Sequence, residues 1–140
     1  MLTTCIIAWF AAQLIKVITT LIKDKKLDFS RLVGAGGMPS SHSSFVTSLA
    51  AGVGFEKGFA GTEFAISAVL ALIVMYDAAG VRRAAGQQAK ILNKLVEEWG
   101  KADFTATDKR LKELLGHTPK EVFAGAVLGI AVAAARHFLF

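Results

Sequence analysis

Residues 36–55 read GGMPSSHSSFVTSLAAGVGF and set a polar cluster directly before an apolar run. Gly36, Gly37 and Pro39 predict a tight backbone, and four hydroxyls and one imidazole then occupy residues 40–44. The run that follows is rich in small residues, which is typical of a closely packed membrane helix. We therefore expect the polar cluster at a helix N-terminus, where free N–H groups and the helix dipole favour an anion.

The composition indicates a small membrane protein. The chain has 140 residues, of which 54% are hydrophobic and 19% are charged, and we treat residues 1–140 as one membrane domain. A soluble domain of this size could not bury so much apolar surface, whereas spans of about 20 residues would place it in lipid. Cys5 is the single cysteine, which excludes an internal disulfide and a zinc site built from cysteines.

Four apolar runs predict transmembrane helices at about residues 2–22, 42–58, 62–79 and 118–138. Between the last two, residues 80–99 carry apolar side chains at helical spacing and charged side chains on the other faces. That pattern predicts an amphipathic helix on the membrane surface or against a partner, with Gln87, Gln88 and Asn93 on its solvated face. The expected fold is all-α, a polytopic membrane helix bundle of about four transmembrane helices plus one amphipathic surface helix.

The charges of the loops predict the orientation. Lys23 to Arg31 holds four basic and two acidic residues, a net +2, and Arg82 to Glu113 holds eight basic and five acidic, a net +3. Glu56 to Glu63 has a net charge of −1. The positive-inside rule then places both basic loops in the cytoplasm, or in the stroma or matrix of an organelle. We expect an integral protein of a bacterial inner membrane or of an organelle such as the chloroplast.

The residues with useful chemistry fall at the same, basic face. His42 opens the second span, Asp77 ends the third and His117 precedes the fourth, so these side chains converge at one end of the bundle. Fixed cations, hydroxyls and two histidines suit phosphoryl transfer, which needs neutralised oxygens, a nucleophile and a proton for the leaving group. The whole convergent set is Lys16, Arg31, Ser40, Ser41, His42, Asp77, Arg82, Arg83, Arg110, His117 and Glu121.

At this point the sequence resembles a known family. Pro39-Ser40-Ser41-His42 is similar to the Pro-Ser-Gly-His motif of type-2 phosphatidic acid phosphatases and vanadium haloperoxidases. The strings GGMPSSHSS, YDAAGVRRAAGQQAKILN and LGHTPKEVFAGAVLG resemble more closely the divergent membrane branch labelled acid phosphatase/vanadium-dependent haloperoxidase-related. The resemblance runs from about Ala11 to Val132.

The resemblance implies roles for individual residues. His42 would be the general acid, with Ser40 and Ser41 donating to a phosphate oxygen. His117 would be the nucleophile and Glu121, four residues later, would orient it. The remaining candidates are cations and their supports: Lys16, Arg31, Arg82 and Arg83 for the phosphate, with Asp77 and Arg110 in supporting positions.

Several of these residues also have purely structural interpretations. Thr118-Pro119-Lys120-Glu121 is a capping box with proline at the first helical position, so Glu121 could bond only the helix start. Asp77 could serve as a structural ion-pair partner of Arg82 or Arg83. Lys16 lies about 6 residues from the end of its span and could either snorkel to the interface or turn inward to an anion. Gly125 and Gly129 form a GxxxG spacing, which predicts close helix packing.

The leading interpretation is a membrane-embedded phosphatase-like protein that hydrolyses a phosphomonoester or diphosphate, on a lipid or on a small molecule, through a phosphohistidine. Neither a metal nor another cofactor is expected, since the cations are side chains. The alternative is a catalytically silent membrane subunit that binds partner proteins or anionic lipid headgroups. Membrane lipids are expected partners and nucleic acid is not, while a homo-oligomer or a larger membrane complex stays open.

Overall fold

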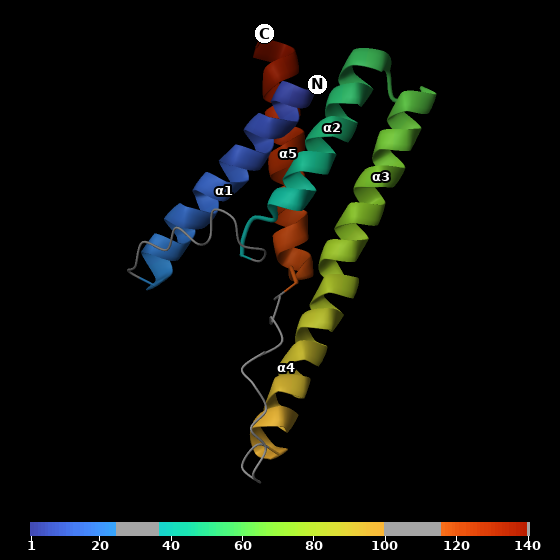
Figure 1. Cartoon of the computed structure of the whole chain (residues 1–140). Coiled ribbons are helices and arrows are strands. Elements are labelled where there is room, and N and C mark those ends of the chain that lie inside the picture. The colour runs from blue at the N-terminus through green and yellow to red at the C-terminus, as the bar shows by residue number, and fades with distance from the viewer. Residues whose placement is uncertain (25–36, 100–115, 140) are drawn as a thin grey trace.

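The computed structural model describes residues 1–24, 37–99 and 116–139. Every regular element in this part is a helix, which confirms the all-α membrane bundle (Figure 1). The helices are α1 (Leu2–Asp24), α2 (Ser41–Lys57), α3 (Thr62–Ala79), α4 (Val81–Trp99) and α5 (Pro119–Leu139). Both termini and the turn between α2 and α3 lie at one end of the bundle (Figure 1). We call this end the terminal end. The opposite end, where α2 and α5 begin, is called the motif end.

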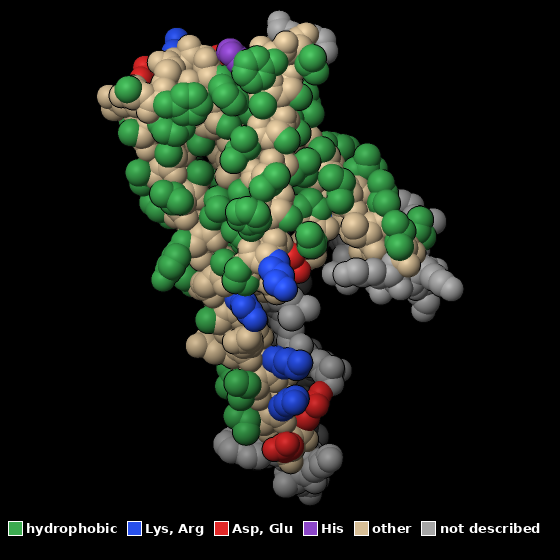
Figure 2. Space-filling model, turned by 180° about the vertical axis from the view of Figure 1, so that it is seen from behind, with side chains coloured by type: hydrophobic (Ala, Val, Ile, Leu, Met, Phe, Trp, Pro, Cys, Tyr) green, Lys and Arg blue, Asp and Glu red, His purple; other side chains and the backbone are tan. Residues whose placement is uncertain are grey.

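The interior of the bundle is made of small and polar side chains, and large apolar side chains lie on its outside. Large apolar side chains such as Phe10, Ile73 and Phe123 are exposed, whereas small and polar side chains fill the interior. Figure 2 shows apolar side chains over the surface of the bundle, with charged side chains at its upper end and more of them on the part that extends below it. This distribution suits a protein whose outer surface contacts lipid tails and whose polar groups pair internally.

Helix α2 is the centre of the bundle and packs against α1, α3 and α5. It has 17 residues and is about 25 Å long at 1.5 Å per residue, somewhat less than the hydrocarbon thickness. Within the described residues, three segments are long and apolar enough to cross a membrane: Leu2–Ile22, Thr62–Glu98 and Pro119–Leu139. The second predicted span is therefore a short helix enclosed by the others.

Close contact between α2 and α5 depends on two glycines. A Cβ atom on Gly125 would collide with the backbone oxygen of Ser40, and one on Gly129 would collide with Thr47 and with the backbone of Ser44. Thr47 uses this approach to donate a hydrogen bond to the Ala126 carbonyl at 3.2 Å. The GxxxG spacing in the sequence thus packs α5 directly on the N-terminal half of α2.

Helices α3 and α4 are separated only by Gly80, and α4 continues roughly along the line of α3 beyond the motif end (Figure 1). Apolar side chains on α4, including Ile91, Leu92 and Val96, are exposed, which agrees with its amphipathic sequence. Asn93, however, is buried rather than solvated. The expectation of a fully solvated polar face on this helix is therefore wrong at Asn93.

Candidate functional site

The N-terminus of α2 is held by its own serines. Ser40 is the N-cap: its Oγ accepts hydrogen bonds from the Ser43 amide at 3.3 Å and from the Ser43 hydroxyl at 3.0 Å. The Ser40 amide donates to the Glu121 carbonyl at 2.9 Å, which joins the start of α2 to the first turn of α5. Ser40 is fully buried, so the structure uses this hydroxyl to cap the helix.

Lys16 turns into the bundle rather than toward the interface. Its Nζ donates to the Ser41 hydroxyl at 3.2 Å and to the Gln13 amide oxygen at 2.9 Å, and the residue is only 2% exposed. A Cβ atom at Gly37, which has a φ of +88°, would lie in van der Waals contact with the aliphatic stem of Lys16. The buried ammonium thus reaches the residue directly before His42.

The two motif histidines meet although 75 positions separate them in the sequence. Their ring centroids lie 5.8 Å apart and the ring planes are nearly perpendicular, at 87°. His42 is exposed on the first turn of α2, whereas His117 is 2% exposed. The nucleophile and acid candidates therefore form an adjacent pair with unequal access to solvent.

The chain on either side of the α3–α4 junction holds His117 in place. The His117 amide donates to the Ala78 carbonyl at 3.1 Å. Gly116 packs against the backbone of Arg82 and Arg83, where any Cβ atom would overlap the Arg83 amide. Only glycine fits at residue 116, and this close approach fixes the position of the next residue, His117.

His117 is kept neutral. Burial of its imidazole, reinforced by the positive charge of Lys16, lowers the pKa of His117 to about 4; His42 and Arg82 act in the same direction. Its Nε2 is buried and has no hydrogen-bond partner among the described residues. A buried nitrogen of this kind is costly unless a ligand or substrate supplies the missing partner.

Asp77 and Arg82 lie near this pair of histidines. Arg82 Nε contacts Asp77 Oδ2 at 2.6 Å, in a partly exposed ion pair, as the structural interpretation of Asp77 predicted. Arg83 is exposed on α4 and contributes its backbone to the contact with Gly116. Arg31 and Arg110 lie outside the described residues.

Glu121 forms the capping box that its sequence context predicts. The Thr118 amide donates to Glu121 Oε2 at 3.0 Å, and the Glu121 amide donates to Thr118 Oγ1 at 3.4 Å. These reciprocal bonds satisfy two N–H groups at the start of α5. The carboxylate thus has a structural use, and its suggested role in orienting His117 stays a prediction.

The structure thus brings Lys16, Ser41, His42, His117 and the Asp77–Arg82 pair to the motif end. Two contributors were not singled out from the sequence. Gln13 is a polar residue within the first apolar run, and its spacing of three from Lys16 places both on one helix face. Gly116 gave a weaker signal, since a glycine directly before a capped helix has several ordinary uses.

Comparison with known proteins agrees with the resemblance of the motifs. The model of the family described as the divergent PAP2 family matches residues 1–132. The chain is 46% identical over 139 residues to the uncharacterized membrane protein YuiD of Bacillus subtilis (strain 168), covering 92% of this chain and 88% of the relative. No solved structure matches the chain. The match over nearly the whole length shows that this integral membrane protein belongs to the divergent PAP2 family.

Proposed function

We propose that the protein hydrolyses a phosphomonoester or diphosphate, carried by a lipid or by a small molecule, through a phosphohistidine intermediate on His117. The observation that carries this proposal is the pairing of two histidines, one neutral and buried, beside a buried lysine. A nucleophile and an acid that act on one phosphoryl group must each come within about 3–3.5 Å of their reacting atoms. Adjacent imidazoles 5.8 Å apart between centroids agree with that requirement.

In the first step, the neutral Nε2 of His117 attacks phosphorus and the P–O bond to the leaving group breaks. His42, as imidazolium, gives its proton to the departing oxygen. A phosphate dianion bound beside His42 favours the protonated imidazole, which prepares the acid only when substrate is present. Lys16, Ser41 and Arg82 are available to balance charge on the phosphoryl oxygens.

In the second step, water attacks the phosphohistidine and His42, now neutral, accepts the water proton. The P–N bond breaks, inorganic phosphate leaves and both histidines return to their starting protonation states. His42 is suited to this exchange of roles because it is exposed to solvent.

The substrate must also reach His117, whose Nε2 is buried. The exposed His42 ring lies next to His117, so a rotation of this side chain is one movement that would admit a phosphoryl group. In this proposal the binding of phosphate moves His42 and supplies the partner that His117 Nε2 lacks.

Phosphate release from labelled phosphatidic acid and from a prenyl diphosphate by the purified protein tests the activity. Wild type is expected to release phosphate, and His42→Ala or His117→Ala is expected to lose about 10²-fold or more of the rate. The matched control is His137→Ala, which changes the third histidine at the terminal end. Equal rates of phosphate release for wild type, His117→Ala and a protein-free blank would refute the proposed phosphatase activity.

We further propose that the motif end faces the cytoplasm, or the stroma of an organelle. The support is the excess of basic residues in Lys23 to Arg31 and in Arg82 to Glu113. Single cysteines introduced at Lys94 and Lys57, in a Cys5→Ser background, should separate the two faces. An impermeant maleimide added to intact cells should label the residue 57 variant alone; labelling of the residue 94 variant alone would reverse the orientation.

A catalytically silent subunit that binds partner proteins or anionic headgroups is the second candidate. Two motif residues have structural roles that favour this second function: Ser40 caps α2 and Glu121 caps α5. Arg82 is likewise engaged with Asp77. Binding of phosphate or of an anionic lipid at the motif end without any phosphate release would support this function.

A further inference from the structure

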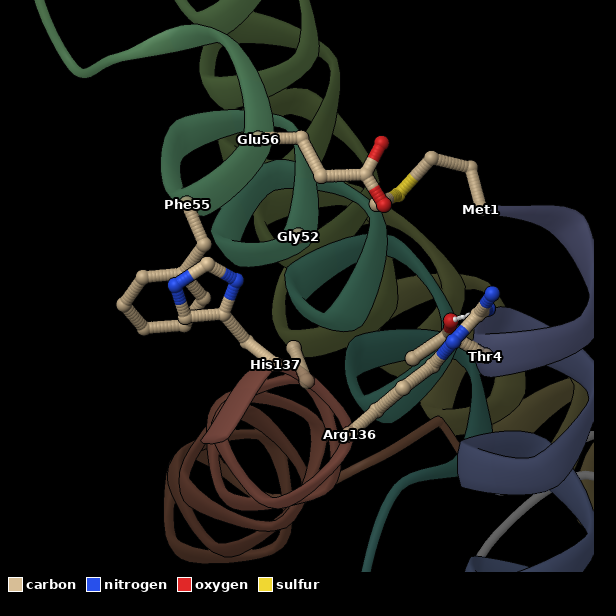
Figure 3. A pocket seen from close by; sticks show the side chains of 8 residues that line it. Met1, Thr4, Gly52, Phe55, Glu56, Arg136 and His137 are labelled. Carbon is tan, nitrogen blue, oxygen red and sulfur yellow. Dashed lines mark hydrogen bonds between the residues drawn. The ribbon is translucent and has the colours of Figure 1, made fainter. Parts of the chain in front are cut away.

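A second polar cleft lies at the terminal end, far from the two motif histidines. It has a volume of about 310 Å³, and Figure 3 shows it between the start of α1, the last turns of α2 and the end of α5. Gly125 marks where α5 meets Ser40, so Arg136 stands 11 residues, or roughly 16 Å, further along the helix. The cleft is therefore separate from the motif end.

Opposite charges border this cleft. Arg136 is held from α5 by a hydrogen bond to Thr4 Oγ1, and Thr4 is itself buried. That bond uses one of the five N–H donors of a guanidinium. Glu56, from the end of α2, projects from another side of the cleft (Figure 3). His137 stacks on Phe55 with centroids 5.2 Å apart, so its ring packs against an aromatic wall.

An apolar groove adjoins the cleft and shares Thr4 and Arg136 with it. The groove has a volume of about 520 Å³ and runs between α1 and α5, with Ile7, Val132, Ala135 and Leu139 among its walls. Both volumes fall in or near the range of small-molecule sites. A guanidinium at the junction of a polar cleft and an apolar groove suits a molecule with a phosphate head and a hydrocarbon tail.

The depth of Arg136 fits a phospholipid headgroup. Helix α5 has 21 residues and is about 31 Å long, close to the thickness of the hydrocarbon core, and Arg136 lies three residues before its end. Glu56 occupies the corresponding place one residue before the end of α2. Both charged groups thus lie at the level of lipid phosphates and headgroups, and their charges are opposite.

We propose that this cleft binds a zwitterionic glycerophospholipid with a primary amine, of the phosphatidylethanolamine type. Arg136 binds the phosphate, Glu56 binds the ammonium group, and one acyl chain lies in the groove along Ala135. Glu56 disfavours an anionic headgroup, because its carboxylate repels a second negative charge.

Native mass spectrometry of the detergent-purified protein tests the proposal with three lipids of equal chain length: phosphatidylethanolamine, phosphatidylcholine and phosphatidylglycerol. Wild type should bind the ethanolamine lipid most tightly. Arg136→Gln should weaken all three by about tenfold, as expected for a lost charge-assisted hydrogen bond. Glu56→Gln should remove only the preference for ethanolamine, and Lys57→Gln, at the next position, should change nothing.

A groove-filling variant keeps the test valid if Arg136→Gln fails to fold. Ala135→Trp should abolish binding of the first lipid, whereas Ala65→Trp, at an exposed position on α3, should leave it intact. Unchanged binding in Arg136→Gln or in Ala135→Trp, or tighter binding of phosphatidylglycerol than of phosphatidylethanolamine by wild type, would overturn the proposal. His117→Ala must keep the lipid, so the outcome is independent of the phosphatase test.

Discussion

Lys16 places a buried positive charge beside the two motif histidines. Its ammonium is bonded to Ser41 and Gln13, and its charge contributes to the lowered pKa of His117. The sequence could not decide between this arrangement and snorkelling, since a lysine about 6 residues from a helix end has both options. Its partners Gln13 and Ser41 decide it: Gln13 lies three residues away on the same helix, whereas the contact with Ser41 arises only from packing α1 on α2.

The pH dependence of turnover tests the electrostatic role of Lys16. His117 must be neutral to attack, so kcat/KM should stay high down to about pH 4 and fall below it, rather than falling near the ordinary histidine value of about 6.5. Lys16→Gln removes a charge that opposes protonation, so the acid limb should move to higher pH. NMR titration of the His117 ring measures the same shift without turnover.

Lys94→Gln, on the distant part of α4, is the control for this experiment and should leave the acid limb in place. An acid limb that stays near pH 4 in Lys16→Gln would show that the charge of Lys16 has no influence on His117.

Two variants of Glu121 distinguish a capping role from a catalytic role of this side chain. Glu121→Gln should keep both the capping box and the activity, because glutamine accepts the same bond from the Thr118 amide. Glu121→Ala should destabilise the protein by about 1 kcal/mol, in the usual range for a lost cap. Thermal unfolding and phosphate release, measured on both variants, distinguish the roles. A large loss of activity in a stable Glu121→Gln protein would instead show that a charged carboxylate orients His117.

At the scale of the helices, apolar runs and small residues in the sequence were sufficient to predict most of the helices. The boundaries of the runs correspond closely to α1, α2, α3 and α5, and the change from apolar to charged residues after Ala79 marks the start of α4. Gly116 could not be assigned from the sequence, because its neighbours across the contact are backbone atoms of Arg82 and Arg83. Backbone contacts between distant segments leave no pattern in a single sequence.

The α2–α5 contact gives a test at this scale. Gly129→Ala should destabilise the bundle by about 1–3 kcal/mol, because the new methyl group meets Thr47 and the backbone of Ser44 in a close-packed interior. Gly52→Ala is the matched control and should have a smaller effect, since the nearest atoms there belong to the flexible end of the Met1 side chain. Unfolding in mixed micelles of a mild and a denaturing detergent measures both. Equal stability of wild type and Gly129→Ala would contradict this packing.

At the scale of the whole molecule, the bundle has different polar chemistry at its two ends. The motif end gathers Lys16, His42 and His117, and the terminal end holds the Arg136–Glu56 cleft. The order of the spans was sufficient to predict that His42, Asp77 and His117 share one end. It carried no signal for the terminal cleft, because Arg136 and Glu56 belong to helix ends that look like ordinary interfacial residues until α1, α2 and α5 are assembled.

Detection of phosphate on His117 tests the proposed phosphohistidine mechanism most directly. The purified protein is mixed briefly with a ³²P-labelled phosphomonoester or prenyl diphosphate, quenched in alkali, and mapped by mass spectrometry. We predict an alkali-stable, acid-labile label on the peptide that contains His117, and none in His117→Ala. Substrate turnover by wild type with no label on His117, or unchanged turnover in His117→Ala, would contradict the phosphohistidine mechanism.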